Sequence, residues 1–212
     1  MSLLLAGSAE AADLGAYLER LLRFDKAAAV RVVAVGDALG VYGRPPFDVL
    51  TLRTWQLLPS SAEGEDLDAT VSAGQLLDAV GKDGALAVPA PLTGATSWTG
   101  FLPPRKGWAP LGALPVAEVE MAALAGIAEF KQRVESVPDQ QRTRAAVDAL
   151  AAEIWDRPLT HGLPVRAAHA ARAMAFLGQA QSAEATVSAA GRWLRLDAPY
   201  GTVVLRVGGG LL

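Results

Sequence analysis

The sequence predicts an α+β fold with a mostly antiparallel sheet of about five strands and with helices packed on one face. Three observations lead to this prediction. Before residue 58 and after residue 184, β-branched and aromatic residues alternate with other residues, and turn residues separate these segments. Between residues 116 and 178, apolar residues recur every three or four positions, as in helices. Strands and helices therefore do not alternate regularly, as they would around a parallel sheet.

Leucines at helical spacing predict a first helix over residues 10–25. Alternating valines then predict a β-hairpin over residues 29–43, with its turn at Gly36-Asp37. A third strand is expected over residues 47–58, after a double proline ends the hairpin.

The next segment is polar and acidic over residues 59–68, which indicates a loop. Asp68 or Thr70 is then expected to cap a helix that ends at Val80. A short strand is expected over residues 85–88, after a glycine-rich turn.

Residues 89–115 are rich in proline and glycine and follow no period, so they predict a long connection without secondary structure. Residues 116–178 predict three helices, separated at prolines. Residues 184–212 predict a C-terminal β-hairpin that returns to the sheet. We expect one domain over residues 1–212, in which residues 1–115, the helical segment and the hairpin are possible subdivisions.

The composition of the chain indicates how it assembles and which classes of partner to expect. Hydrophobic residues make up 51% of the chain and charged residues 19%, so a homodimer is expected to cover surplus apolar surface. The net charge is −3 and the pI about 5.4, which argues against a broad basic face, so no nucleic-acid partner is expected. With no signal peptide and no run of 18 apolar residues, we expect a cytoplasmic protein without a membrane partner.

Two segments, VYGRPPFDVL over residues 41–50 and PLTGATSWTGFLPPR over residues 91–105, resemble an uncharacterised family of conserved proteins from high-GC Gram-positive bacteria. The resemblance extends over much of the chain. It implies no activity and no catalytic residue, because that family has no assigned function. It agrees with a cytoplasmic location.

Residues 89–115 are the candidate site, because polar, aromatic and cationic side chains occur together there. An Arg-Lys pair can hold a carboxylate or phosphate, and tryptophans offer rigid contact area. We therefore predict a non-catalytic binding or interaction protein that contacts a protein partner or a small anionic ligand. A loop pinned on the domain by two buried tryptophans is the purely structural alternative. The predicted ligand-binding residues are Thr96, Ser97, Trp98, Thr99, Arg105, Lys106 and Trp108.

An enzyme is the alternative function. It would act on a small anionic metabolite in a pocket under the loop, with Arg105 orienting the substrate. Asp37 or Asp48 would be the general base. No catalytic residue follows from a motif, since Ser97 lies outside the G-x-S-x-G pattern of a nucleophile elbow.

No metal or cofactor is expected. His161 and His169 lie eight positions apart with a proline between them, which is not the i, i+4 spacing of a helical metal pair. The absence of cysteine excludes thiolate nucleophiles, disulfides and cysteine zinc sites.

Overall fold

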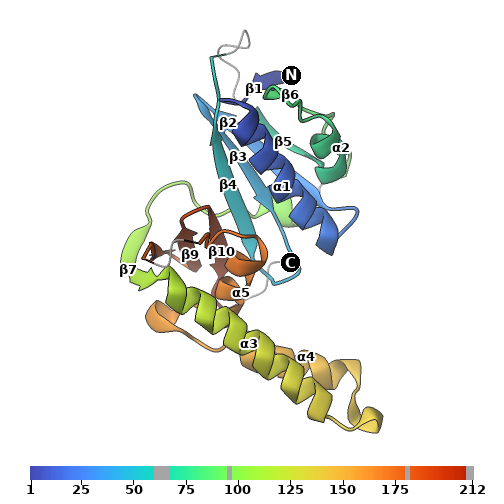
Figure 1. Cartoon of the computed structure of the whole chain (residues 1–212), viewed down its shortest axis with the longest axis vertical. Coiled ribbons are helices and arrows are strands. Elements are labelled where there is room, and N and C mark those ends of the chain that lie inside the picture. Colours follow the sequence, from blue (N-terminus) through green and yellow to red (C-terminus); the bar gives the residue numbers. More distant parts are fainter. Residues whose placement is uncertain (60–66, 95–96, 180–181, 209–212) are drawn as a thin grey trace. The chain divides into compact units, whose positions relative to one another are not determined.

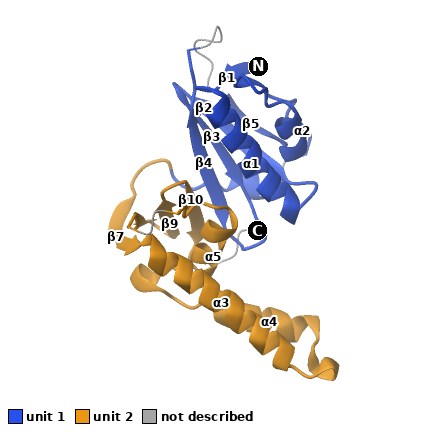
Figure 2. Cartoon of the chain, in the orientation of Figure 1, with its two compact units in different colours: residues 1–104, 209–212 blue, residues 105–208 orange. Residues whose placement is uncertain are grey.

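The computed structural model describes residues 1–59, 67–94, 97–179 and 182–208. The chain divides into two compact units, Met1–Pro104 and Arg105–Gly208 (Figure 2). The division falls inside the segment 89–115. This segment therefore contributes to both units, and its predicted site residues belong to two different bodies.

A four-stranded antiparallel sheet in the order β5-β2-β3-β4 forms the first unit (Figure 1). Its strands are β2 (Ala29–Val35), β3 (Ala38–Gly43), β4 (Leu50–Gln56) and β5 (Leu67–Ser72). The predicted hairpin with its turn at Gly36-Asp37 is confirmed, because Val35 pairs with Ala38. Gly36 has a φ of 60°, a conformation that glycine adopts without strain.

Helix α1 (Ser8–Phe24) lies along this sheet and buries its apolar stripe against it (Figure 1). Its buried residues are Ala11, Leu14, Tyr17, Leu18 and Leu21. Helix α2 (Ala73–Asp78) packs against α1, and the short strands β1 (Ser2–Leu4) and β6 (Ala85–Ala87) form a separate two-stranded sheet.

The helix before Val80 was expected to begin at Asp68 or Thr70. This predicted start is wrong, because both residues lie in β5. Thr70 pairs with Arg31 of β2, and Asp68 is therefore the diagonal neighbour of Arg31 across the two strands. The Arg31 guanidinium binds both oxygens of Asp68, at 2.6 and 2.9 Å. This cross-strand ion pair favours the strand, and α2 begins only after Ser72, whose hydroxyl accepts the Gln75 N–H.

The second unit contains a four-stranded antiparallel sheet in the order β10-β9-β8-β7. Its strands are β7 (Ala109–Pro115), β8 (Glu184–Ala190), β9 (Trp193–Ala198) and β10 (Gly201–Arg206). Three helices lie between β7 and β8 in the chain: α3 (Val116–Ser136), α4 (Arg144–Trp155) and α5 (Val165–Ala173). Helix α5 packs its buried alanines against β10 and α3.

Eight strands make up these antiparallel sheets, so the antiparallel character is confirmed, but the expectation of about five strands is wrong. The helices are also distributed over two units, where one face of one sheet was expected. Strand β7 lies in the segment expected to have no secondary structure. As the last strand in the sheet order it tolerates Pro110 and Pro115, with a bulge between Pro110 and Gly112. Across the described residues, no helix is both long and apolar enough to cross a membrane.

Candidate functional site

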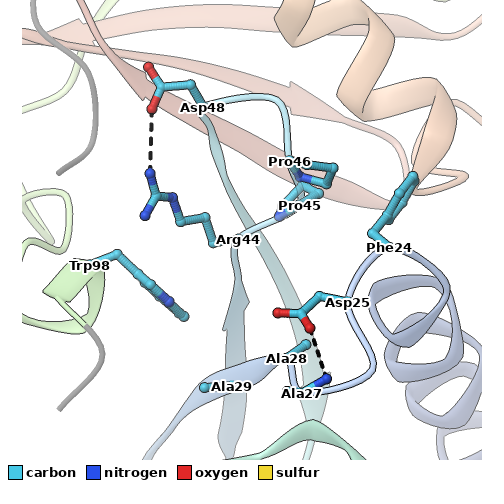
Figure 3. Close-up of a pocket in the computed structure, with 10 residues that line it drawn as sticks. All are labelled: Phe24, Asp25, Ala27, Ala28, Ala29, Arg44, Pro45, Pro46, Asp48 and Trp98. Carbon is cyan, nitrogen blue, oxygen red and sulfur yellow. Dashed lines mark hydrogen bonds and ion pairs between the residues drawn. The ribbon is translucent and has the colours of Figure 1, made fainter.

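A cavity of about 550 Å³ opens in the first unit and contains one of the predicted site residues, Trp98 (Figure 3). The end of α1, the β3–β4 connection and the single 3₁₀ turn η1 (Ser97–Gly100) contribute to it. We call it the Arg44 cavity. Its volume lies in the range of small-molecule and side-chain binding sites. It is lined by Phe24, Asp25, Ala27, Ala28, Ala29, Arg44, Pro45, Pro46, Asp48 and Trp98.

The β3–β4 connection places both of its charged groups at the cavity. Pro45 and Pro46 fix the backbone, and the Phe47 N–H donates to the Pro45 carbonyl at 2.8 Å. Asp48 has a φ of 52°, a left-handed conformation that aspartate tolerates better than most residues. The Arg44 guanidinium lies 3.7 Å from the Asp48 carboxylate, a loose ion pair with both side chains partly exposed.

Trp98 forms the wall of the Arg44 cavity that lies opposite Asp25 (Figure 3). It is only 6% exposed, and the turn that carries it is tied to the sheet. Arg31 donates a hydrogen bond to the Thr99 carbonyl, and the Leu92 N–H donates to the Thr70 carbonyl at 2.8 Å. The Trp98 ring is therefore held in place before any ligand arrives.

Asp25 follows the last residue of α1 and faces the cavity. Its Oδ1 accepts the Ala27 N–H at 2.8 Å, which fixes the side chain (Figure 3). The residue is exposed, and it makes no ion pair with any described residue. Beside it, Phe24 is 43% exposed and meets Phe47 edge-on at a ring distance of 5.3 Å.

A polar network, partly buried at Asp13 and fully buried at Tyr17, holds α1 on the sheet. Arg53 of β4 binds both oxygens of Asp13, at 2.5 and 2.6 Å, and Trp55 Nε1 donates to Asp13 Oδ2 at 2.8 Å. Tyr17 OH lies 2.9 Å from Thr51 Oγ1. Burial raises the pKa of Tyr17 well above its usual range, so the phenol stays protonated.

The predicted site residues are divided between the two units. Trp98 and Thr99 are buried in the first unit, whereas Arg105 and Lys106 are exposed in the second. Trp108 also belongs to the second unit, where the Arg195 guanidinium lies 5.3 Å from its ring centroid. Thr96 lies outside the described residues, and Ser97 begins η1.

The enzyme alternative assigns its residues to both units. Its substrate-orienting Arg105 belongs to the second unit, and both of its proposed bases, Asp37 and Asp48, belong to the first. Asp48 is paired with Arg44, and the Asp37 carbonyl accepts the Leu57 N–H at 2.7 Å in the hairpin turn.

Sequence reasoning missed Phe24, Asp25 and Arg44. The available signal was the segment Arg44-Pro45-Pro46-Phe47-Asp48, where a rigid double proline is flanked by opposite charges. Nothing in the sequence alone connects this segment with Trp98, about fifty positions later, because the sheet brings them together.

Both histidine rings pack against other residues of the second unit. The His169 ring stacks on Trp155 at 4.7 Å, and burial, followed by the charge of Arg172, lowers the pKa of His169. The His161 ring fills the space beside Gly112, where a Cβ would lie 2.2 Å from it. Among residues whose placement is described, no group of three or more histidines or carboxylates could hold a metal.

Two families match the chain, and their limits coincide with the two units. Residues 103–210 match the domain of unknown function DUF8185, and residues 1–100 match the domain of unknown function DUF8010. No curated protein matches the chain.

Solved structures share the fold. The DNA polymerase sliding clamp from Caulobacter crescentus is 14% identical, with a TM-score of 0.55 over 99% of this chain and 66% of the clamp. The Helicobacter pylori beta clamp in complex with 5-chloroisatin is 11% identical, with a TM-score of 0.56 over 99% of this chain and 64% of the clamp. The DNA polymerase III subunit beta from Pseudomonas aeruginosa is 13% identical, with a TM-score of 0.52 over 99% of this chain and 65% of that subunit. The chain thus spans just under two thirds of the clamps' length.

This likeness corrects the expectation that the protein has no nucleic-acid partner, because the proteins that share its fold are clamps of a DNA polymerase. The expectation relied on a net charge of −3. Net charge sums over the whole surface, whereas phosphate contacts depend on the charges of one face.

Proposed function

This chain belongs to the DUF8185 family, and because nearly all of it has the fold of DNA polymerase sliding clamps, we propose that it is a non-catalytic, clamp-type interaction protein that works on DNA. The observation that carries this proposal is the extent of the likeness, which covers 99% of the chain and therefore both units. In this function the assembled protein encloses DNA, and partner proteins dock on it, one of them at the Arg44 cavity.

Ion pairs between elements make each unit a firm scaffold. Arg53 with Asp13 joins β4 to α1, and Arg31 with Asp68 joins β2 to β5. In the second unit Arg133 joins α3 to Glu153 of α4 at 2.8 Å. These pairs connect one element to another, which is the use expected of charges in a rigid body.

Cations at the end of α1 are available for DNA. Arg20, Arg23 and Lys26 are at least partly exposed, and they make no ion pair or side-chain hydrogen bond with the described residues. Arg20 and Arg23 lie one helical turn apart and share a face. Such a cluster can contact successive phosphates although the whole chain is acidic.

The test is the salt dependence of binding to a labelled DNA duplex, followed by fluorescence anisotropy. Substituting alanine for Arg20, Arg23 and Lys26 together should weaken binding and reduce the slope of log affinity against log salt by about three, about one per lost phosphate contact. A matched variant removes three cations from the second unit, K106A/K131A/R144A.

That control should keep the slope of the wild-type protein. Equal losses in both variants would mean that the overall charge, and not the end of α1, sets the affinity. No measurable binding by the wild-type protein at low salt would argue against the proposed function itself.

A further inference from the structure

We propose that the Arg44 cavity binds the guanidinium of an arginine side chain presented by a protein partner. The proposal deepens the interaction function above, since it names the group that the partner inserts. It starts from the charges of the lining, which are two carboxylates, Asp25 and Asp48, and one guanidinium, Arg44. The lining itself is therefore negative by one charge, whereas the cations Arg23 and Lys26, which flank Phe24 and Asp25 in the chain, are not among the lining residues.

Asp25 is the group that receives the cation. One hydrogen bond from the Ala27 N–H fixes its Oδ1, and a carboxylate has room for several more donors. None of the described cationic side chains pairs with it. Figure 3 shows its carboxylate directed across the cavity toward Trp98, while Arg44 extends away toward Asp48.

Trp98 supplies the second half of a guanidinium site. Guanidinium groups stack on indole faces and donate two parallel hydrogen bonds to carboxylates. No aromatic ring or cation of the described chain contacts the Trp98 ring. A planar cation can therefore lie between this ring and Asp25.

The first unit already contains the same combination where α1 meets the sheet, in a partly buried position. There the Arg53 guanidinium binds both oxygens of Asp13 and lies 5.9 Å from the Trp55 ring centroid. The Arg44 cavity repeats the carboxylate and the tryptophan in Asp25 and Trp98, while its own arginine, Arg44, is paired with Asp48. An arginine from outside completes the set.

The rim favours a polypeptide as the source. Phe24 is 43% exposed and Pro46 is also exposed, so residues flanking the inserted arginine find apolar contacts. Arginine and aromatic residues are enriched among the energetically dominant residues of protein interfaces. A site with an open aromatic rim and a charged floor fits that pattern.

The test uses blocked arginine, N-acetyl-arginine N-methylamide, as the probe and nuclear magnetic resonance as the readout. Titration into the full chain should shift the Trp98 indole N–H signal, which Trp98→Phe identifies by its loss. Blocked citrulline has the same shape without the charge, and it should bind at least about tenfold more weakly, because a charged hydrogen bond is replaced by a neutral one.

Asp25→Asn keeps an oxygen for the Ala27 N–H and removes only the charge. This variant should therefore bind the blocked arginine at least about tenfold more weakly than the wild type does. Asp78→Asn, on α2 of the same unit, is the matched control and should bind as the wild type does. Asp48→Asn is a second variant, because asparagine accepts the left-handed backbone at this position, and it should also weaken binding.

Three results would overturn the proposal: no shift of the Trp98 signal, equal binding of citrulline, or full binding by both Asn variants. A response to blocked glutamate in place of arginine would make the cavity an anion site centred on Arg44. Binding of the probe requires no DNA, so this proposal and the proposed function fail separately.

Discussion

Tyr17 and Thr51 illustrate how single residues set the position of α1. Both are fully buried, and Thr51 Oγ1 donates to the Gly43 carbonyl at 3.2 Å while it lies 2.9 Å from Tyr17 OH. The phenol also lies 3.3 Å from the Val41 carbonyl. One hydroxyl pair therefore connects the helix to both β3 and β4.

Removing either hydroxyl should destabilise the first unit. Tyr17→Phe and Thr51→Val should each lower the free energy of unfolding by about 1–2 kcal/mol, because each leaves a buried polar group with fewer partners. The double variant should cost clearly less than the sum, since the second change removes a group already deprived of its partner. Urea unfolding measures all three, and strictly additive losses would contradict the pairing.

Trp98 shows what a single residue's chemistry can predict. Its place in a loop rich in proline and glycine suggested either a site residue or a buried anchor, and in the structure Trp98 is buried and lines a cavity. Arg105 could not be judged in the same way, because its neighbours depend on which unit it joins. That division is a property of the whole fold and is absent from the local sequence.

At the scale of elements, the close approach of α1 to β3 depends on Gly43. A Cβ at this position would lie 2.6 Å from Leu21 Cδ1 and 2.9 Å from Tyr17 OH, and both side chains are buried. The same strand offers a comparison at Gly40, where a Cβ would meet Leu52 Cδ1 at an ordinary 3.4 Å.

Gly43→Ala should therefore destabilise the protein by about 1–3 kcal/mol, as overpacked core positions do. Gly40→Ala should leave stability unchanged or raise it slightly, because alanine restricts the unfolded chain more than glycine does. Thermal or urea unfolding of the two variants gives the comparison. Equal stability of both would mean that α1 shifts freely on the sheet.

Exposed ion pairs join α3 to α4 through Arg133 and Glu153, and to the residues just after α4 through Glu129 and Arg157. Hydrogen bonds from Arg157 lower the pKa of Glu129, and hydrogen bonds from Arg133 lower that of Glu153. A carboxylate whose pKa is lowered by folding stabilises the protein above its ordinary pKa of 4.5, and this contribution is lost as the pH falls through the lowered value.

The melting temperature of the double variant Glu129→Gln/Glu153→Gln should lie below that of the wild type at neutral pH. The difference should shrink as the pH falls below 4.5, where the wild-type carboxylates also become neutral. High salt at neutral pH should shrink it too, since these charges are exposed. A difference that stays constant with both pH and salt would contradict an electrostatic origin.

The success of sequence reasoning differed among elements. Apolar spacing of three and four residues correctly predicted the helices between residues 116 and 178, because that period is the direct signature of a buried helix face. Strands β5 and β8 each carry only two β-branched residues, and their other positions include Asp68 and small residues such as Ala185. Their strand conformation is fixed by neighbours in the sheet, which no local pattern contains.

At the scale of the whole molecule, we predict a homodimer. The 51% hydrophobic composition leaves large apolar side chains at the surface, among them Met121 and Leu124, one turn apart on α3 and 61% and 44% exposed. Light scattering should give a mass of about twice the 22.0 kDa of the chain. A mass of one chain across a wide concentration range would contradict this.

The central claim is a clamp-type association with DNA, and retention on a circular plasmid tests it most directly. The protein is incubated with a nicked circular plasmid, and half of the sample is then linearised before gel filtration at physiological salt. A protein that encloses DNA should elute with the circle and be released once the plasmid has ends from which it can slide. Equal retention on circular and linear DNA would indicate binding along a groove, and elution apart from both forms would contradict the account.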